Sequence, residues 1–148
     1  MLIVLFDDLA TFDNKTYSYE MNDCYHLVFR DCSEVLPVAV MAKTLSSNLK
    51  EVKILAGQVS MVMSPKSKTE VELKMNLEGQ VKNIIVNAGQ IKEIKNSEQL
   101  TILEIRRYQD NVYTVYLPKE GLLVLFDGER VEISASQLLK SRYSIGNL

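Results

Sequence analysis

The chain has 148 residues, 47% of them hydrophobic and 24% charged, with a formal net charge of −2. This length suits one domain with its own hydrophobic core, and the composition excludes a disordered chain. The acidic balance also excludes the overall attraction to nucleic acid or anionic lipid that a basic domain shows. We therefore expect a single domain over residues 1–148, with local basic patches at most.

Residues 1–6 form a short apolar run that Asp7 and Asp8 close, which is typical of a buried strand. No basic segment precedes this run and no small-residue cleavage site follows it, so we expect no signal peptide. No uncharged apolar run approaches the roughly 20 residues of a membrane helix. Two cysteines without a processing signal favour a reducing compartment. The expectation is a cytoplasmic protein that does not contact a membrane.

The next segments predict a hairpin and a helix. Polar and apolar side chains alternate over residues 16–21, and a second strand-like run covers residues 25–30. A turn at Asn22 and Asp23 separates the two segments, as in a hairpin. Residues 36–49 then place apolar side chains at the i, i+3, i+4, i+7 spacing of one helix face. Pro37 suits the first turn of a helix, where its missing N–H removes no hydrogen bond. We expect one amphipathic helix over about 36–49.

From residue 52 onward the pattern is one of short strands separated by turns. Asp127-Gly128 is the clearest hairpin signal, because both residues tolerate the positive φ of a type I′ turn. Ser134 or Ser136 can cap a short C-terminal helix that continues to Tyr143, and 144–148 is expected to be a frayed tail. In the first part of this region Leu55, Val59, Met61 and Met63 are expected to share a face, and the strands that follow are expected at 71–77, 81–86, 91–94, 100–108, 112–117, 122–126 and 130–134.

These elements define an expected fold class. They predict a β-rich α+β domain in which a meandering antiparallel sheet curls into a barrel or a sandwich, with one helix after the first hairpin. Such a sheet has edges to hide, which favours a homo-oligomer, and 84–86 or another apolar run would supply the contact.

Catalytic and metal-binding patterns are weak. Cys24, His26 and Cys32 are zinc-type ligands, but an extended strand holds Cys32 too far from the other two for one metal, so buried structural cysteines are the simpler interpretation. The glycines never cluster into a phosphate-binding loop, and no serine lies in a nucleophile elbow. We expect no cofactor and no metal. The residues favour a non-enzyme without deciding the matter.

Basic and aromatic residues in the second half of the chain are the best binding candidates. Lysines in loops neutralise phosphates, and exposed tyrosines stack on bases. The same lysines also serve as ordinary solubilising residues that discourage edge-to-edge strand pairing. The expected nucleic-acid or partner-binding residues are Lys66, Lys68, Lys82, Arg106, Arg107 and Tyr108.

Residues 112–140 add a family resemblance. Val112-Tyr-Thr-Val-Tyr-Leu117, followed by residues 122–139 with their aromatic-Asp-Gly hairpin, strand and closing leucine, resembles the last hairpin of SH3-like small barrels of the KOW and Tudor type. The resemblance covers about 30 of the 148 residues. It implies a binding module for nucleic acid or for another protein.

The function that these patterns favour is a non-catalytic binding or assembly protein that presents a β framework to a protein or nucleic-acid partner. Its residue usage, without tryptophan, suits a viral or mobile-element accessory protein. The alternative is a small metal-dependent hydrolase or nuclease, because carboxylate-held magnesium leaves little sequence signature. Its ligands would come from Asp7, Asp8, Asp13, Asp23 and Asp31.

Overall fold

The computed structural model describes residues 2–5, 8–10, 16–18, 24–31, 38–46, 48–67, 69–135 and 143–144. These residues form β-strands and turns and contain no helix. The strands are β1 (Leu2–Leu5), β2 (Asp8–Ala10), β3 (Thr16–Ser18), β4 (His26–Asp31), β5 (Val38–Ser46), β6 (Leu49–Ala56), β7 (Val59–Ser67), β8 (Glu70–Leu77), β9 (Gln80–Ile84), β10 (Ile91–Lys95), β11 (Thr101–Arg107), β12 (Tyr113–Leu117), β13 (Leu122–Phe126), β14 (Arg130–Ala135) and β15 (Tyr143–Ser144).

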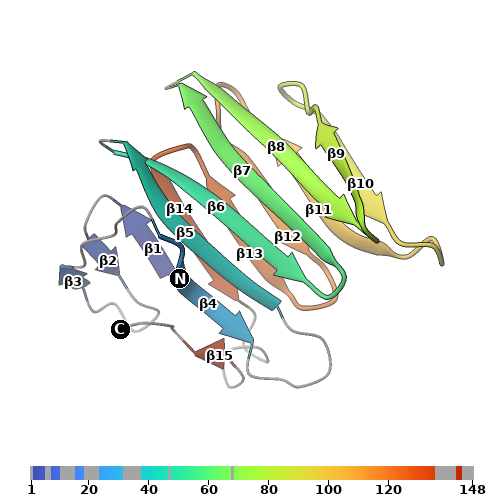
Figure 1. Ribbon diagram of the computed structural model, residues 1–148, viewed down its shortest axis with the longest axis horizontal. Helices are drawn as coiled ribbons and strands as arrows, with labels where there is room; N and C mark the ends of the chain where they lie inside the picture. The colour runs from blue at the N-terminus through green and yellow to red at the C-terminus, as the bar shows by residue number, and fades with distance from the viewer. Residues whose placement is uncertain are drawn as a thin grey trace.

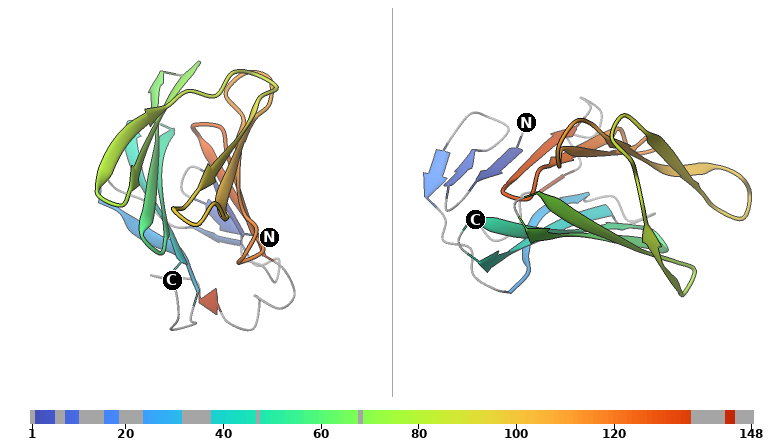
Figure 2. Two further views of the ribbon diagram at one scale, coloured as in Figure 1. Left: turned by 90° about the vertical axis from the view of Figure 1, so that its right-hand side faces the viewer. Right: turned by 90° about the horizontal axis from the view of Figure 1, so that it is seen from above.

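The strands form two antiparallel sheets. An eight-stranded sheet has the order β10-β11-β12-β13-β14-β1-β2-β3, and a seven-stranded sheet has the order β15-β4-β5-β6-β7-β8-β9. Figures 1 and 2 show the two sheets as layers that face each other. Most neighbours are consecutive hairpin strands, but β1 pairs with β14, with Leu2 opposite Ile133. As far as residues are described, the fold is a β-sandwich of two open sheets without a closed barrel.

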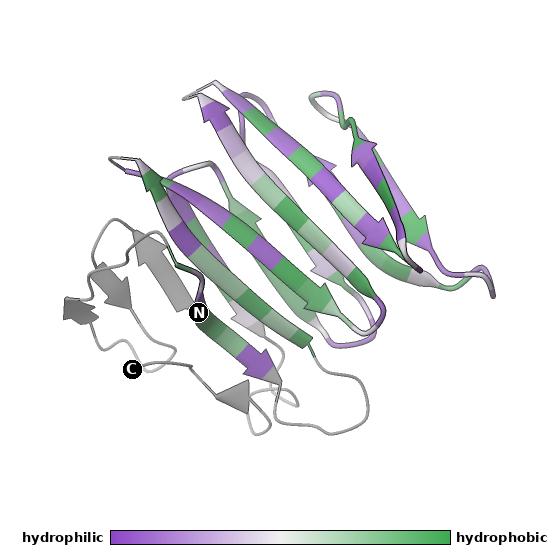
Figure 3. Cartoon of the chain, in the orientation of Figure 1, coloured by the Kyte–Doolittle hydropathy of each residue, from purple (hydrophilic) through white to green (hydrophobic). Residues whose placement is uncertain are grey.

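Alternation along the strands builds the core. In β6 and β7 every second side chain is buried, and these buried side chains face the other sheet. Figure 3 shows the matching alternation of apolar and polar residues. Ile54 and Met61 of one sheet, and Ile105 and Val124 of the other, belong to the same buried cluster. One hydrophobic core between the layers therefore holds both sheets.

The turn between β13 and β14 joins the layers through the backbone. Asp127 Oδ1 accepts hydrogen bonds from the N–H groups of Glu129 at 2.9 Å and Arg130 at 2.7 Å. Gly128 has φ of 99°, and its carbonyl accepts a hydrogen bond of 2.8 Å from the N–H of Lys50 at the start of β6. The Asp-Gly pair thus closes its own hairpin and contacts the opposite sheet.

The α+β class and the helix over 36–49 are wrong. Residues 38–46 form β5, and β6 begins at Leu49. Val38, Val40 and Ala42 are buried at a spacing of two, whereas Leu45, which the helical pattern counts as core, is exposed. Residues 38–42 are apolar at every position, so a helical and an extended pattern both fit them. Pairing with β4 and β6 decides between them, and β-branched valines favour that outcome.

Two other local predictions need correction. The hairpin over 16–30 is wrong, because β3 pairs with β2 in the eight-stranded sheet whereas β4 pairs with β5 and β15 in the other. The short C-terminal helix is not present in the described residues: Ser134 belongs to β14 and Tyr143 to β15, and 136–142 lie outside them. Of the predicted tail, Ser144 pairs with Arg30, and 145–148 lie outside the described residues. The β-rich character itself is confirmed.

Candidate functional site

Both sheets end in an edge strand, paired on one side only within the described residues, at the same end of the sandwich. Among the described strands, β9 is the last of the seven-stranded sheet and β10 the first of the eight-stranded one, and residues 85–90 connect them (Figure 1). We call β9, residues 85–90 and β10 the open edge. Strand edges carry backbone N–H and C=O groups that another chain can pair with.

Apolar side chains are exposed along this edge. Val81 is 67% exposed, Ile85 74% and Ile91 46%, and Leu100, in the turn that follows β10, is 60% exposed. Scattered surface hydrophobic residues are ordinary, but contiguous ones mark contact surfaces. Four of the nine exposed large apolar side chains of the described residues fall within this stretch of 20 positions. The exposed apolar surface is therefore concentrated at the open edge and the adjoining turn.

Arg107 holds the connection between β9 and β10 in place. Its Nη1 donates to the carbonyl of Val86 at 3.2 Å, and its Nε donates to the carbonyl of Asp110 at 3.0 Å. Its backbone accepts from Gly89 N–H at 2.8 Å and donates to Gln90 at 3.2 Å. The guanidinium also lies 5.5 Å from the centre of the Tyr113 ring. These contacts fix the connecting segment against β11 and the turn after it.

The structure brings only some of the predicted binding residues together. Lys82 lies in β9, and Arg106 pairs with Ile91 of β10, with its guanidinium 6.0 Å from the ring of Tyr108. Arg107 is engaged in the contacts just described. These four predicted residues therefore lie on or beside the open edge.

The other two predicted binding residues do not join them. Lys66 Nζ lies 2.6 Å from a carboxylate oxygen of Glu72, and this hydrogen bond raises the pKa of Lys66. The ion pair lies on the outer face of the seven-stranded sheet, beside a hollow of about 460 Å³. Lys68 lies outside the described residues. The basic residues therefore do not form one continuous patch within the described part of the chain.

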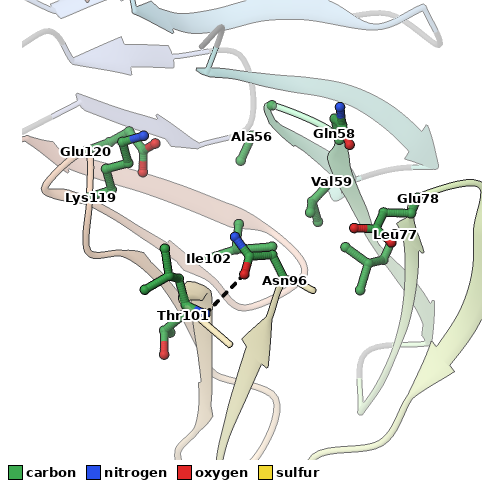
Figure 4. Close-up of a pocket in the computed structure, with 12 residues that line it drawn as sticks. Ala56, Gln58, Val59, Leu77, Glu78, Asn96, Thr101, Ile102, Lys119 and Glu120 are labelled. Carbon is green, nitrogen blue, oxygen red and sulfur yellow. Dashed lines mark hydrogen bonds between the residues drawn. The ribbon is translucent and has the colours of Figure 1, made fainter. Parts of the chain in front are cut away.

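A small hollow opens between the two sheets at one end of the sandwich (Figure 4). Its volume is about 230 Å³, and turns from both sheets border it. Asn96 shapes one of these turns, since its Oδ1 accepts hydrogen bonds from the N–H groups of Glu98 at 2.9 Å and Leu100 at 3.0 Å. Leu77 and Ile102 supply apolar wall, and Lys119 and Glu120 supply charged rim. This hollow adjoins the open edge through Leu77 and Leu100.

The described residues contain no cluster of three or more His, Cys, Asp or Glu side chains that would hold a metal ion. Asp8 lies in β2 of one sheet and Asp31 in β4 of the other, and Asp7, Asp13 and Asp23 lie outside the described residues. Cys24, just before β4, is exposed rather than buried as expected, and Cys32 also lies outside the described residues. The aspartate-based alternative therefore stays a prediction.

The fold and the open edge define a class of protein: a β-sandwich domain that offers apolar side chains and strand edges for contact. The chain belongs to the von Willebrand factor type D domain family, whose model matches residues 5–143. It is 27% identical over 128 residues to vitellogenin-2 of Caenorhabditis elegans, a match that covers 85% of this chain and 7% of that protein. It is 31% identical over 100 residues to vitellogenin-2 of Gallus gallus, covering 65% of this chain and 5% of that protein.

The family assignment corrects three predictions. The SH3-like resemblance is wrong, because 112–135 form β12, β13 and β14 of an open sheet in a type D domain. The cytoplasmic location is wrong, because the family and its vitellogenin relatives indicate a secreted or extracellular protein. A viral origin and nucleic-acid partners have no support. A non-catalytic binding or assembly role with a protein partner agrees with the family. In the described part of the chain, no helix is long and apolar enough to span a membrane.

Sequence reasoning missed most of the open edge. It named 84–86 as one run that could meet another chain, but it did not single out Val81, Ile91 or Leu100. A signal was present at Ile84-Ile85, since adjacent side chains of a strand point to opposite faces and cannot both enter one core. In the structure Ile84 is buried and Ile85 is exposed.

Proposed function

We propose that the chain is a non-catalytic assembly domain of a secreted protein, which binds a protein partner through the open edge. The observation that carries this proposal is the exposure of four apolar side chains on and beside two edge strands: Val81, Ile85, Ile91 and Leu100. Apolar side chains at the centre of a patch supply most of the favourable free energy of protein association. Unpaired backbone groups supply directional hydrogen bonds to an extended partner segment.

Polar residues at the margin suit the same role. Lys82, Arg106 and Tyr108 flank the apolar side chains, and protein interfaces surround an apolar centre with a polar rim in which arginine and tyrosine are frequent. We propose that these three predicted residues contribute at that rim. Arg107 has a supporting role in this proposal, because its Nη1 donates to Val86 of the connecting segment and its Nε donates to Asp110 in the turn after β11.

The experiment compares the chain with a variant in which the four apolar residues are threonine: Val81→Thr, Ile85→Thr, Ile91→Thr and Leu100→Thr. Each immobilised protein is incubated with extracellular fluid of the source organism, and binding of every retained protein is then measured with purified components. The proposal is supported by a protein that binds the wild type with a saturable isotherm and binds the variant at least tenfold more weakly. This decrease is expected because the loss of several buried apolar groups costs more than about 1.4 kcal/mol of binding free energy.

A matched control carries Tyr116→Thr and Leu123→Thr, which alter exposed apolar side chains on the outer face of the eight-stranded sheet. This control is expected to retain the partner. Equal binding by the wild type, the four-residue variant and the control would show that the open edge does not bind the partner.

A further inference from the structure

The two strands of the open edge differ in how well they are protected against pairing. β10 carries Lys92, Glu93 and Lys95, and its register with β11 shifts between Ile94 and Lys95. Charges and bulges of this kind discourage another strand from adding to an edge. β9 carries Lys82 as its one charged residue and pairs with β8 without a register shift. β9 is therefore the edge that can accept a further strand.

The β8–β9 turn shows which backbone groups of β9 face outward. Glu78 and Gly79 have φ of 52° and 84°, and Leu77 pairs with Gln80 across them, as in a two-residue type I′ hairpin. The residues that flank such a turn exchange hydrogen bonds, and the bonded positions then alternate along the strand. Gln80, Lys82 and Ile84 consequently direct their backbone groups to β8. Val81 and Asn83 direct theirs to the free edge.

We propose that β9 pairs antiparallel with β9 of a second copy of this chain, with Asn83 of each copy opposite Asn83 of the other. This inference rests on the proposed assembly function and names its partner and its register. Val81 of each copy then lies opposite Ile85 of the other, so that two of the most exposed apolar side chains of the described residues cover each other. Such cross-strand pairs are the unit by which neighbouring strands stabilise one another.

Side-chain chemistry selects this register over its neighbours. Centring the pair on Lys82 places two ammonium groups directly opposite each other, which is destabilising. Centring it on Val81 pairs Val81 with itself and leaves Ile85 opposite Leu77, at the far side of the turn. The register centred on Asn83 places Lys82 opposite Ile84 and separates the two lysines. It alone matches Val81 with Ile85 and keeps like charges apart.

The geometry of the dimer follows from this register. A twofold axis through Asn83 keeps the buried face of one seven-stranded sheet continuous with the buried face of the other, because paired residues point to the same side. One pair of short strands contributes less contact than the roughly 1,200–2,000 Å² of a stable interface. The dimer is therefore weak and forms reversibly with concentration.

Sedimentation equilibrium of the full chain over a concentration series gives the first test. The wild type is expected to show a reversible monomer–dimer equilibrium. Asn83→Pro removes an outward N–H and leaves the bonds to β8 in place, so it should show no dimer at the concentration at which the wild type is half dimeric. Asn83→Ser keeps the N–H and should dimerise like the wild type. A monomeric wild type, or dimerisation of the proline variant, would overturn the proposal.

A cysteine scan tests the register without relying on the proline variant. In a background with Cys24→Ser and Cys32→Ser, single substitutions Val81→Cys, Lys82→Cys and Asn83→Cys are oxidised and the fraction of covalent dimer is followed with time. Only the residue on the twofold axis meets its own copy within the roughly 4.4–6.8 Å between Cα atoms that a disulfide requires. Asn83→Cys should form dimer at least several times faster than the other two. Equal rates, or faster dimerisation of either other variant, would contradict the register.

The two proposals can fail separately. In one outcome the wild type is monomeric, and a protein from the extracellular fluid binds the wild type but not the four-residue variant. The self-pairing is then wrong and the assembly function stands. If the chain neither self-associates nor binds any such protein through the open edge, both are wrong.

Discussion

Glu51 of β6 interacts with several neighbouring side chains. It accepts a hydrogen bond from the Tyr25 hydroxyl, and its carboxylate lies 3.2 Å from Lys43 Nζ. Lys43 Nζ is also 4.7 Å from the centre of the Tyr25 ring. Partial burial acts to raise the pKa of Glu51, but the hydrogen bonds from Tyr25, Ser64 and Lys43 outweigh it and hold the pKa below its usual value. The charged form of Glu51 therefore stabilises this face of the sheet.

The lowered pKa predicts a pH dependence. In the folded state Glu51 binds its proton at a lower pH than in the unfolded chain. Its contribution to stability is thus present above the ordinary pKa of a glutamate and is lost as pH falls through the folded value. Glu51→Gln should flatten the acid side of the curve of unfolding free energy against pH, measured by urea titration between about pH 2 and pH 7. Tyr25→Phe removes one of the hydrogen bonds and should flatten it less. Parallel curves for wild type and Glu51→Gln would contradict this assignment.

Single residues also show where sequence patterns stop being informative. Lys50 is only 1% exposed at the start of β6, although lysine is among the residues least often buried. Its side chain is not without an interaction partner. The spacing of two that Lys50 shares with Val52 and Ile54 indicates the inward face of the strand, unlike the position of Lys53, but lysine as a residue type opposes burial there. The position depends on how the β13–β14 turn meets β6, which is a long-range contact.

The segment that connects β9 to β10 depends on Arg107. A lysine at this position has one compact ammonium group, which cannot serve the carbonyls of Val86 and Asp110 together and cannot stack its plane on Tyr113. Arg107→Lys is expected to lower the unfolding free energy by about 1–3 kcal/mol, the cost of losing hydrogen bonds to a charged group. Amide hydrogen exchange of residues 85–90 should accelerate more than that of β6 or β7.

The matched control is Arg106→Lys at the adjacent position. The guanidinium of Arg106 lies over the Tyr108 ring at the surface, so its replacement should change stability by less than about 0.5 kcal/mol. If both substitutions have the same effect on exchange of residues 85–90, the connecting segment is not held by Arg107.

The elements were predictable where local chemistry alone determines them. Residues 71–77 alternate cleanly and lie in β8, and Asp127-Gly128 lies in the turn between β13 and β14. The predicted type I′ geometry of that turn is wrong, because of the two residues only Gly128 has a positive φ, and Phe126 pairs with Val131 across a longer loop. The stretch 36–49 is different, because its apolar residues satisfy two periodicities and only pairing with β4 and β6 selects one. The strands at 16–18 and 26–31 lie in different sheets, which no short-range pattern indicates. Hairpin signals identify neighbours along the chain but not the points where it changes sheet.

At the scale of the whole molecule, both sheets share one core. Leu103 and Ile105 of the eight-stranded sheet and Met61 and Met63 of the seven-stranded sheet belong to one buried cluster. Each sheet shields the apolar inward face of the other sheet from water. The two sheets are therefore expected to unfold together. The same shared core bears on the candidate site, because β9 and β10 lie where the two layers end and Val81, Ile85 and Ile91 remain exposed there.

Leu103→Ala tests this coupling. Truncation of a fully buried leucine should lower the unfolding free energy by about 2–5 kcal/mol through lost burial and the cavity left behind. Amide hydrogen exchange measures this free energy at amides that exchange only through global unfolding. For such amides the decrease should be the same in β6 and β7 of the opposite sheet as in β11 and β12. Leu123→Ala on the outer face should have little effect. Loss of protection confined to the eight-stranded sheet would show that the layers unfold independently.

The pairing of β1 with β14 has a consequence for how the chain reaches this fold. Leu2 lies opposite Ile133, so β1, which can pair at once with the adjacent β2, meets β14 only after the residues up to 133 have been made. Closing so large a loop is slow, and residues emerge from the ribosome only gradually. The amino-terminal strands must therefore wait, and the meander from β5 to β14 is expected to assemble first. Docking of β1 onto β14 is then the late step of folding, and it is the step at which misfolding during synthesis is most readily expected.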